Sequence, residues 1–305
     1  MIANRVRNRY APSARLVYEC LDIHRLLLSS GLSGALLRSL EFRLWREVDL
    51  LLTSSQAFVT NYFSPRNFRA AVRLVENKLV LCGRDDSPGA SLRPQAGPPW
   101  RIGWFGAIRC RKSLQILSDL AKVSNGTVEI LLRGRPSGAV FPNFEADIRD
   151  IPHVHYGGPY RNPDDLRRIY DEVHFNWAID YYESGLNSAW LLPNRLYEGT
   201  YHGAVPIALA GVETSAWLAR HHIGVVQSEP LLEHLAAFFR SLDPHAYAFL
   251  AQSVQAVPRA NIVSDEADCR DLVQSLRRPL AAHVAVRRSG AQHILAPTIS
   301  NGSGT

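Results

Sequence analysis

The sequence predicts an α/β protein whose larger part is a doubly wound, Rossmann-like parallel sheet. Three observations support this fold class: short apolar runs recur after residue 100, helical stretches separate them, and a proline- and glycine-rich segment precedes them. The expected strands are 100–106, 128–132, 154–156, 173–177, 205–210 and 223–226. Because strands and helices alternate at this spacing, we expect the strands to run parallel with helices on both faces.

The helices between and after these strands follow from apolar residues at helical spacing. They are expected over 113–123, 144–150, 163–171, 195–202, 213–221, 231–242, 245–257 and 265–277. Asn162 is expected to cap the helix over 163–171, with Pro163 in its first turn. We therefore assign a C-terminal domain to residues 100–285 and a tail to residues 286–305.

The first 82 residues predict a smaller and incomplete α/β unit. The expected strands are 16–21, 49–53 and 72–75. An amphipathic helix is indicated by an apolar stripe of Leu37, Leu40, Leu44, Val48 and Leu51, the last of which fits the strand better. Ser54 or Ser55 is suited to cap a helix that runs through Phe63. Because so few strands cannot bury both faces of a sheet, residues 1–80 are not expected to form a self-contained domain.

Residues 83–99 are crowded with glycine and proline, which predicts a linker between the two parts. The net charge is +6, and nearly all of the excess lies in residues 1–73. A basic N-terminal part fits a polyanion or an anionic membrane surface. Nucleic acid is not expected as a partner, because neither a helix-turn-helix pattern nor interleaved aromatic and basic residues accompany the charge.

The composition excludes several classes of protein. Apolar residues make up 46% of the chain and charged residues 20%, which favours a packed core over disorder. No apolar run approaches the length of a membrane-spanning helix, and the N-terminus lacks the apolar region of a signal peptide. The four cysteines form no CxxC pair and the histidines lack zinc-site spacing, so we expect neither a metal nor a disulfide framework. A cytoplasmic location is expected.

The turn after the first strand of the larger part is a candidate anion site. Gly103 and Gly106 lie at the strand end, and Arg109, Arg111 and Lys112 lie at the start of the next helix. Glycines allow backbone N–H groups to approach an anion, and the helix dipole adds positive potential. The spacing is not the dinucleotide fingerprint, and a tight turn with a solvated basic rim remains the alternative.

Two further segments carry polar side chains at expected strand ends. Asn194 is suited to cap the helix that carries Arg195 and Glu198. At this end of the sheet, we expect the arginine to bind a phosphate and the carboxylate to accept hydrogen bonds from ribose hydroxyls. The alternative is an ion pair within the helix. The loop that contains Asp180 and Glu183 has polar side chains that could bind a sugar. The alternative is a surface loop without a ligand.

Together these segments resemble the donor domain of GT-B glycosyltransferases of the retaining family-4 type, with rhizobial succinoglycan-like exopolysaccharide glucosyltransferases as the nearest group. The resemblance covers about residues 100–280, and 16–80 more weakly. It rests on Trp-Phe-Gly-Ala-Ile-Arg-Cys-Arg-Lys-Ser at 104–113, Glu-Ser-Gly-Leu at 183–186 and Pro-Asn-Arg-Leu-Tyr-Glu at 193–198.

The resemblance implies the roles of individual residues. The implied donor and nucleotide ligands are Gly106, Arg109, Lys112, Gly185, Asn187, Asn194, Arg195 and Glu198. Within this set, Glu198 binds the ribose, Arg109 and Lys112 bind the diphosphate, and Arg195 stands where many relatives have lysine. Glu183, with the backbone of residues 185–188, faces the donor sugar. Asp22 and His24 resemble acceptor-side polar residues and complete the catalytic candidates with Glu183.

The chain departs from the family pattern in two respects. The paired glutamates of the family lie closer together than Glu183 and Glu198 do. The opening strands of the acceptor domain and their glycine loop have no counterpart, which favours a truncated gene product or a misassigned start codon.

The function expected from the resemblance is transfer of a hexose, glucose from UDP-glucose, to a lipid-linked exopolysaccharide intermediate. No metal or other cofactor is expected, because basic residues and a helix N-terminus neutralise the leaving diphosphate. The expected location is the cytoplasmic side of the inner membrane, with peripheral contact to anionic lipid. A GT-B-fold nucleotide-sugar epimerase and a non-catalytic nucleotide-sugar-binding remnant are the alternatives.

Overall fold

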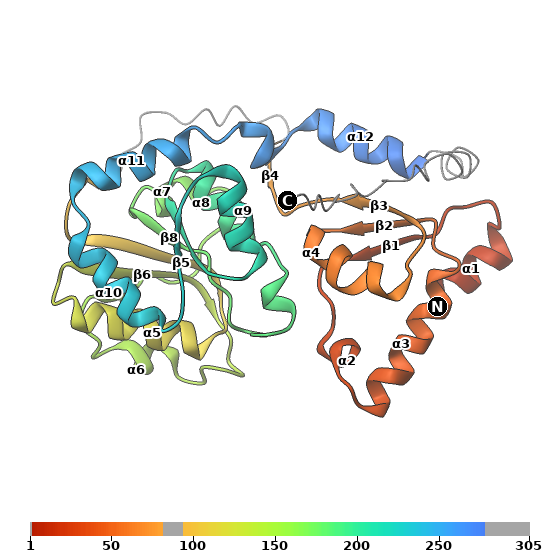
Figure 1. Ribbon diagram of the computed structural model, residues 1–305, viewed down its shortest axis with the longest axis horizontal. Coiled ribbons are helices and arrows are strands. Elements are labelled where there is room, and N and C mark those ends of the chain that lie inside the picture. The colour runs from red at the N-terminus through yellow and green to blue at the C-terminus, as the bar shows by residue number, and fades with distance from the viewer. Residues whose placement is uncertain (1, 82–93, 278–305) are drawn as a thin grey trace, which may run out of the picture.

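The computed structural model describes residues 2–81 and 94–277. It contains two α/β units, which lie side by side in Figure 1 with the N-terminal unit in red and orange. Residues 83–93 of the expected linker, the last residues of the expected C-terminal domain and the expected tail lie outside the described residues.

The larger unit is built on a six-stranded sheet in which every strand runs parallel to its neighbours. The strand order is β10–β9–β8–β5–β6–β7. The strands are β5 (Trp100–Ile108), β6 (Val128–Pro136), β7 (Val154–Tyr156), β8 (Phe175–Trp177), β9 (Val205–Leu209) and β10 (Val225–Gln227). Each strand overlaps an apolar run identified in the sequence, and the predicted fold class is confirmed.

Helices cover both faces of this sheet. In Figure 1, α5 and α10 lie on one side of the sheet, and α8 and α9 lie on the other. The helices are α5 (Arg111–Val123), α6 (Phe144–Ile148), α7 (Leu166–Tyr170), α8 (Asn194–Tyr201), α9 (Glu213–His221), α10 (Leu231–Ser241) and α11 (Pro244–Gln255), with short 3₁₀ turns at Asn187–Ala189 and Arg259–Asn261. Because helices pack on both faces, the strand interiors are buried throughout: Ile102, Ile130 and Phe175 expose no surface.

Two helix starts differ from the sequence expectation. α7 begins at Leu166 with Asp165 at its N-cap, because the Asn162 side chain turns to Glu198 instead of capping this helix. α8 has Pro193 at its N-cap, and Asn194 is its first residue rather than its cap. Both asparagines therefore line a cavity instead of closing a helix end.

The smaller unit has a three-stranded parallel sheet in the order β1–β2–β3. Its elements are α1 (Ile2–Tyr10), β1 (Val17–Cys20), α2 (Arg25–Leu28), α3 (Leu32–Trp45), β2 (Leu50–Thr53), α4 (Gln56–Phe58), a π-helical turn (Val59–Phe63), a 3₁₀ turn (Ser64–Arg66) and β3 (Ala71–Leu74). Ser55 caps α4, as expected. The core of this unit is a small aromatic cluster in which Trp45 packs against Tyr62, Phe63 and Phe68.

The chain crosses between the two units twice. The connecting elements are β4 (Leu79–Val80), β11 (Val263–Ser264) and α12 (Glu266–Arg277). β4 pairs with β11, and α12 then returns to the smaller unit, where Arg73 lies 2.8 Å from Asp271. Arg15 donates to the Ser275 carbonyl at 2.5 Å. The last described helix of the expected C-terminal domain is thus fastened to the N-terminal sheet.

Candidate functional site

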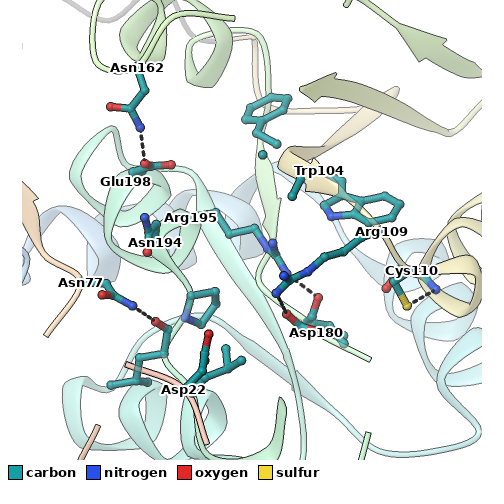
Figure 2. Close-up of a pocket in the computed structure, with 18 of the residues that line it drawn as sticks. Asp22, Asn77, Trp104, Arg109, Cys110, Asn162, Asp180, Asn194, Arg195 and Glu198 are labelled. Carbon is teal, nitrogen blue, oxygen red and sulfur yellow. Dashed lines mark hydrogen bonds and ion pairs between the residues drawn. The ribbon is translucent and has the colours of Figure 1, made fainter. Parts of the chain in front are cut away.

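A cavity of about 450 Å³ opens at the carboxyl ends of β5 and β8 (Figure 2). The chain leaves β5 in one direction through β6 and β7 and returns on the other side of β5 as β8, so strand order reverses here. Doubly wound sheets bind ligands at this kind of position. The N-terminal unit closes the cavity with Leu21, Asp22 and Asn77.

One end of the cavity is formed by the turn between β5 and α5. Gly106 has a φ of +112°, and a side chain on the neighbouring Gly134 would collide with its carbonyl oxygen, so the two glycines allow close backbone approach. Cys110 is the N-cap of α5 and its Sγ accepts from the Ser113 N–H. The Ser113 hydroxyl is buried, lines the cavity and has no hydrogen-bond partner among the described residues. This end suits an anion with several acceptor oxygens.

Arg109 stands at the mouth of this end of the cavity. Its guanidinium lies 3.6 Å from Asp180 Oδ2 and 4.5 Å from the centre of the Tyr182 ring. Asp180 is itself fixed, because it accepts from the Tyr182 N–H at 2.7 Å and the Ser188 hydroxyl at 3.1 Å. The arginine is therefore held by one charge contact and one aromatic contact.

The structure does not bring Lys112 into the cavity, contrary to the role expected for it. Lys112 Nζ lies 2.6 Å from Glu229 Oε1 and 4.1 Å from the centre of the Tyr181 ring. The lysine holds the pKa of Glu229 below its usual value. Because Glu229 also accepts from the Tyr181 hydroxyl and the Leu231 N–H, it fixes the ammonium outside the cavity lining.

The other end of the cavity holds a buried carboxylate. Glu198, on α8, exposes only 6% of its surface. Its Oε1 accepts from Asn162 Nδ2 at 2.8 Å and its Oε2 accepts from the Tyr170 hydroxyl at 3.4 Å. Burial raises the pKa of Glu198, although these two donors and the charge of Arg195 each lower it. A partly satisfied buried carboxylate in a cavity suits a ligand that brings further donors.

The ion pair within α8 that the sequence left open does not form. Arg195 NH2 donates to the Ile179 carbonyl at 2.8 Å instead of meeting Glu198. A side chain on Gly199 would collide with Asn176, whose amide donates to the Arg195 carbonyl at 2.5 Å. Close packing of α8 on β8 thus aims both charged side chains at the cavity.

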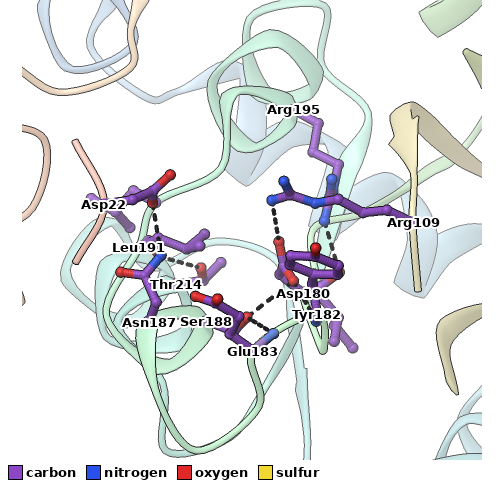
Figure 3. A network of polar contacts seen from close by, with 12 residues as sticks. Asp22, Arg109, Asp180, Tyr182, Glu183, Asn187, Ser188, Leu191, Arg195 and Thr214 are labelled. Carbon is purple, nitrogen blue, oxygen red and sulfur yellow. Dashed lines mark hydrogen bonds and ion pairs between the residues drawn. The ribbon is translucent and has the colours of Figure 1, made fainter. Parts of the chain in front are cut away.

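A second cavity, of about 260 Å³, adjoins the first. Asp22, Arg109 and Leu191 line both cavities, and the second also takes in His24 and Glu183. Figure 3 shows Asp22, Arg109 and Glu183 around this region. The structure therefore brings together the three residues that the sequence assigned to catalysis, although two of them lie about 160 positions from the third.

Asn187 and Ser188 line the second cavity, and the Asn187 side chain also links the two units. Asn187 accepts from the Ile23 N–H at 3.0 Å and donates to Asp22 Oδ1 at 2.8 Å, so its side chain joins the two units. The Leu186 and Ser188 N–H groups donate to the Glu183 carbonyl within the loop. Gly185, with a φ of +77°, makes the loop turn and lines neither of the two cavities.

His24 serves as a helix cap at the edge of the second cavity. Its Nδ1 accepts from the Leu26 N–H at 3.3 Å, and its ring is exposed. Sequence reasoning left Asn77, Tyr160 and Ser113 without a role in the site, yet all three line the larger cavity. Asn77 and Tyr160 lie two and four positions after expected strands, and Ser113 begins an expected helix. This placement is their only local signal.

No cluster of three or more histidine, cysteine or acidic residues suited to a metal ion occurs among residues 2–81 and 94–277. Within the same ranges, no helix is both long and apolar enough to cross a membrane.

Comparison with solved structures shows that the chain has the GT-B glycosyltransferase fold. Anabaena HepE in complex with UDP and glucose matches with a TM-score of 0.61 at 16% identity, over 86% of this chain and 71% of HepE. Sucrose-phosphate synthase of Thermosynechococcus elongatus matches with a TM-score of 0.62 at 16% identity, over 90% of this chain and 70% of the synthase. WaaG, a glycosyltransferase involved in lipopolysaccharide biosynthesis, matches with a TM-score of 0.55 at 14% identity, over 83% and 75% of the two chains.

Sequence comparison identifies the family. The chain is 44% identical over 281 residues to the succinoglycan biosynthesis protein ExoL of Rhizobium meliloti (strain 1021), covering 90% of this chain and 69% of ExoL. The chain therefore belongs to the ExoL family, and the predicted resemblance is confirmed. No protein-family model matches it.

Proposed function

We propose that the chain is a hexosyltransferase that moves glucose from UDP-glucose to a lipid-linked exopolysaccharide intermediate at the cytoplasmic face of the inner membrane. One observation carries this proposal: the anion-suited turn of α5 and the buried Glu198 lie at opposite ends of one cavity. A nucleoside diphosphate has an anionic diphosphate, which matches the α5 turn, and a ribose diol, which matches Glu198. HepE, a structural neighbour, was solved with UDP-glucose, which supports the choice of donor.

The nucleotide occupies the larger cavity in this proposal. The two ribose hydroxyls donate to Glu198, which then gains donors beyond Asn162 and Tyr170. The diphosphate faces the N-terminus of α5, where the Ser113 hydroxyl and Arg109 meet its oxygens. Gly106, Asn194 and Arg195 line the space between the two ends.

The donor sugar occupies the second cavity, with its anomeric carbon where the cavities meet at Asp22 and Arg109. The bond from this carbon to the phosphate oxygen breaks, the acceptor oxygen bonds to the carbon, and the acceptor proton passes to the departing UDP. Arg109 and the α5 N-terminus stabilise the charge that develops on UDP, so the chemistry requires no metal. Retention of configuration follows from the family resemblance, and Glu183 orients the sugar.

Product analysis tests this proposal and separates it from its alternatives. The chain is incubated with UDP-[¹⁴C]glucose and a lipid extract that contains undecaprenyl-linked saccharides. Transfer predicts radiolabel in the lipid phase and one UDP released per sugar moved. An epimerase would instead leave the label on a nucleotide or a free isomerised sugar. A binding remnant would retain UDP affinity with no label transferred, and either result contradicts the proposal.

A further inference from the structure

A carboxylate faces the anion-suited end of the larger cavity. Asp180 lines this cavity just after β8, and its side chain exposes only 8% of its surface. Asp180 Oδ2 lies 3.6 Å from the guanidinium of Arg109, the arginine to which the proposed function assigns the diphosphate. Figure 2 shows the two side chains directed at each other. A bound diphosphate and Asp180 therefore compete for one guanidinium.

The loop holds Asp180 in this position independently of Arg109. Asp180 Oδ1 accepts from the Tyr182 N–H at 2.7 Å and from the Ser188 hydroxyl at 3.1 Å. The Ser188 hydroxyl in turn accepts from the Glu183 N–H at 2.9 Å, which directs its proton to Asp180. If the carboxylate turned away from the cavity, both of its donors would lose their acceptor. Asp180 therefore keeps its place when Arg109 moves to a phosphate.

Asp180 lies at the passage between the two cavities (Figure 3). Arg109 lines both cavities, and Tyr182, Glu183 and Ser188 of the same loop line the second. In the proposed function the diphosphate lies in the larger cavity and the donor sugar in the second. Asp180 is then beside the outer phosphate, at the bond that joins this phosphate to the sugar.

The outer phosphate differs in charge before and after sugar transfer. In UDP-glucose it is esterified to the sugar, whereas in UDP its free end gains about one further negative charge above a pKa of about 6. Like charges that lie close together repel, and they repel more strongly in a partly buried site than in water. The hydroxyl groups of a sugar, by contrast, donate hydrogen bonds to a carboxylate oxygen. A fixed carboxylate at this place therefore opposes the product and accepts the donor.

We propose that Asp180 is a specificity-determining residue that favours the sugar-bearing donor over the nucleoside diphosphate product. The proposal rests on the proposed function for the identity of the two ligands. A purely structural role in anchoring the loop is the alternative. Loss of the anchor would change the affinities for donor and product alike, whereas loss of the charge beside the outer phosphate would change their ratio.

Calorimetric titration of the full chain with UDP and with UDP-glucose, without an acceptor, tests this inference. Asp180→Asn removes the charge and keeps an oxygen that accepts from the loop. Asp180→Ser is the second variant, because its hydroxyl is able to accept from the Tyr182 N–H. Glu172→Gln is the matched control: Glu172 lies 3.1 Å from Arg133 in another ion pair and lines neither cavity. The melting temperature of every variant is measured.

In both Asp180 variants, the affinity for UDP relative to UDP-glucose is expected to rise by at least about fivefold, because the charge that opposes UDP is gone. The control should keep the parent's ratio. A smaller rise in either folded Asp180 variant, equal changes for the two ligands, or the same rise in the control overturns the inference.

The same samples separate this inference from the proposed function. Absence of UDP binding by the parent contradicts both. The expected rise in the ratio, combined with no transfer of radiolabel to lipid in the product analysis, contradicts the proposed function and supports the role of Asp180.

Discussion

Asn187 Nδ2 lies 2.8 Å from Asp22 Oδ1, although 165 positions of the chain separate the two residues. The same amide accepts from the buried Ile23 N–H at 3.0 Å. One side chain in the loop after β8 therefore fixes the N-terminal segment that contributes Asp22 to both cavities. Two further hydrogen bonds join the units nearby, from Ser55 to the Trp190 carbonyl and from Asn77 to the Leu192 carbonyl.

Exchanging the two side chains should reverse the direction of the hydrogen bond between Asn187 and Asp22. Asn187→Asp places two carboxylates together, and we expect the free energy of unfolding to fall by about 1–3 kcal/mol, the usual cost of an unmet buried polar group. Adding Asp22→Asn restores a donor opposite an acceptor and should recover most of the loss. Chemical denaturation of the parent, both single variants and the double variant measures the coupling. Additive effects of the two substitutions would contradict the direct contact.

Arg109 and Lys112 should differ in their effect on UDP binding. Arg109→Gln is expected to weaken UDP binding by about 1.5–3 kcal/mol, the scale of a charge-assisted hydrogen bond. Lys112→Gln should cost less, because its ammonium is held by Glu229. Arg111→Gln is the control, since its guanidinium packs over the Phe141 ring at 5.0 Å. Calorimetric titration with UDP and with uridine makes the comparison.

Uridine lacks phosphates, so it should bind the Arg109 variant as it binds the parent. The difference between the two ligands should shrink as salt rises, because screening weakens the charge contact. Equal losses for UDP and uridine would show that Arg109 is structural.

The raised pKa of Glu198 predicts how stability depends on pH. A carboxyl group whose pKa is higher in the folded state keeps its proton longer there, so stability falls as pH rises from the ordinary glutamate pKa through the raised one. Glu198→Gln removes this loss. Without nucleotide, the variant should be more stable than the parent at about pH 8, and the difference should disappear at about pH 4. Thermal unfolding at both pH values checks this; a variant less stable at pH 8 would contradict it.

The sequence predicted the sheet well because its strands are buried on both faces. All three residues of β8 and residues 205–208 of β9 are buried, and such apolar runs stand out between polar turns. In the smaller unit only β2 is buried at every position, and β1 and β3 were found as short apolar runs although they are partly exposed.

The parts of the site that the sequence missed depend on contacts between distant segments. Asn162 reads locally as a helix cap before a proline, and only the placement of α8 brings Glu198 to its amide. Lys112 reads as a diphosphate ligand, and nothing near it indicates Glu229, 117 positions away. Local sequence patterns predicted the secondary-structure element on which each residue lies. Tertiary packing determines which partner each side chain contacts.

In the proposed function, Glu198 binds the ribose of a uridine diphosphate. Calorimetric titration of the parent and Glu198→Gln with UDP and with 2′-deoxy-UDP measures this contact. The parent should bind one UDP, and the substitution should weaken UDP binding by about 1–3 kcal/mol. 2′-Deoxy-UDP should bind the parent weakly and lose little more affinity on substitution. Equal losses for the two nucleotides, or no UDP binding by the parent, would contradict it.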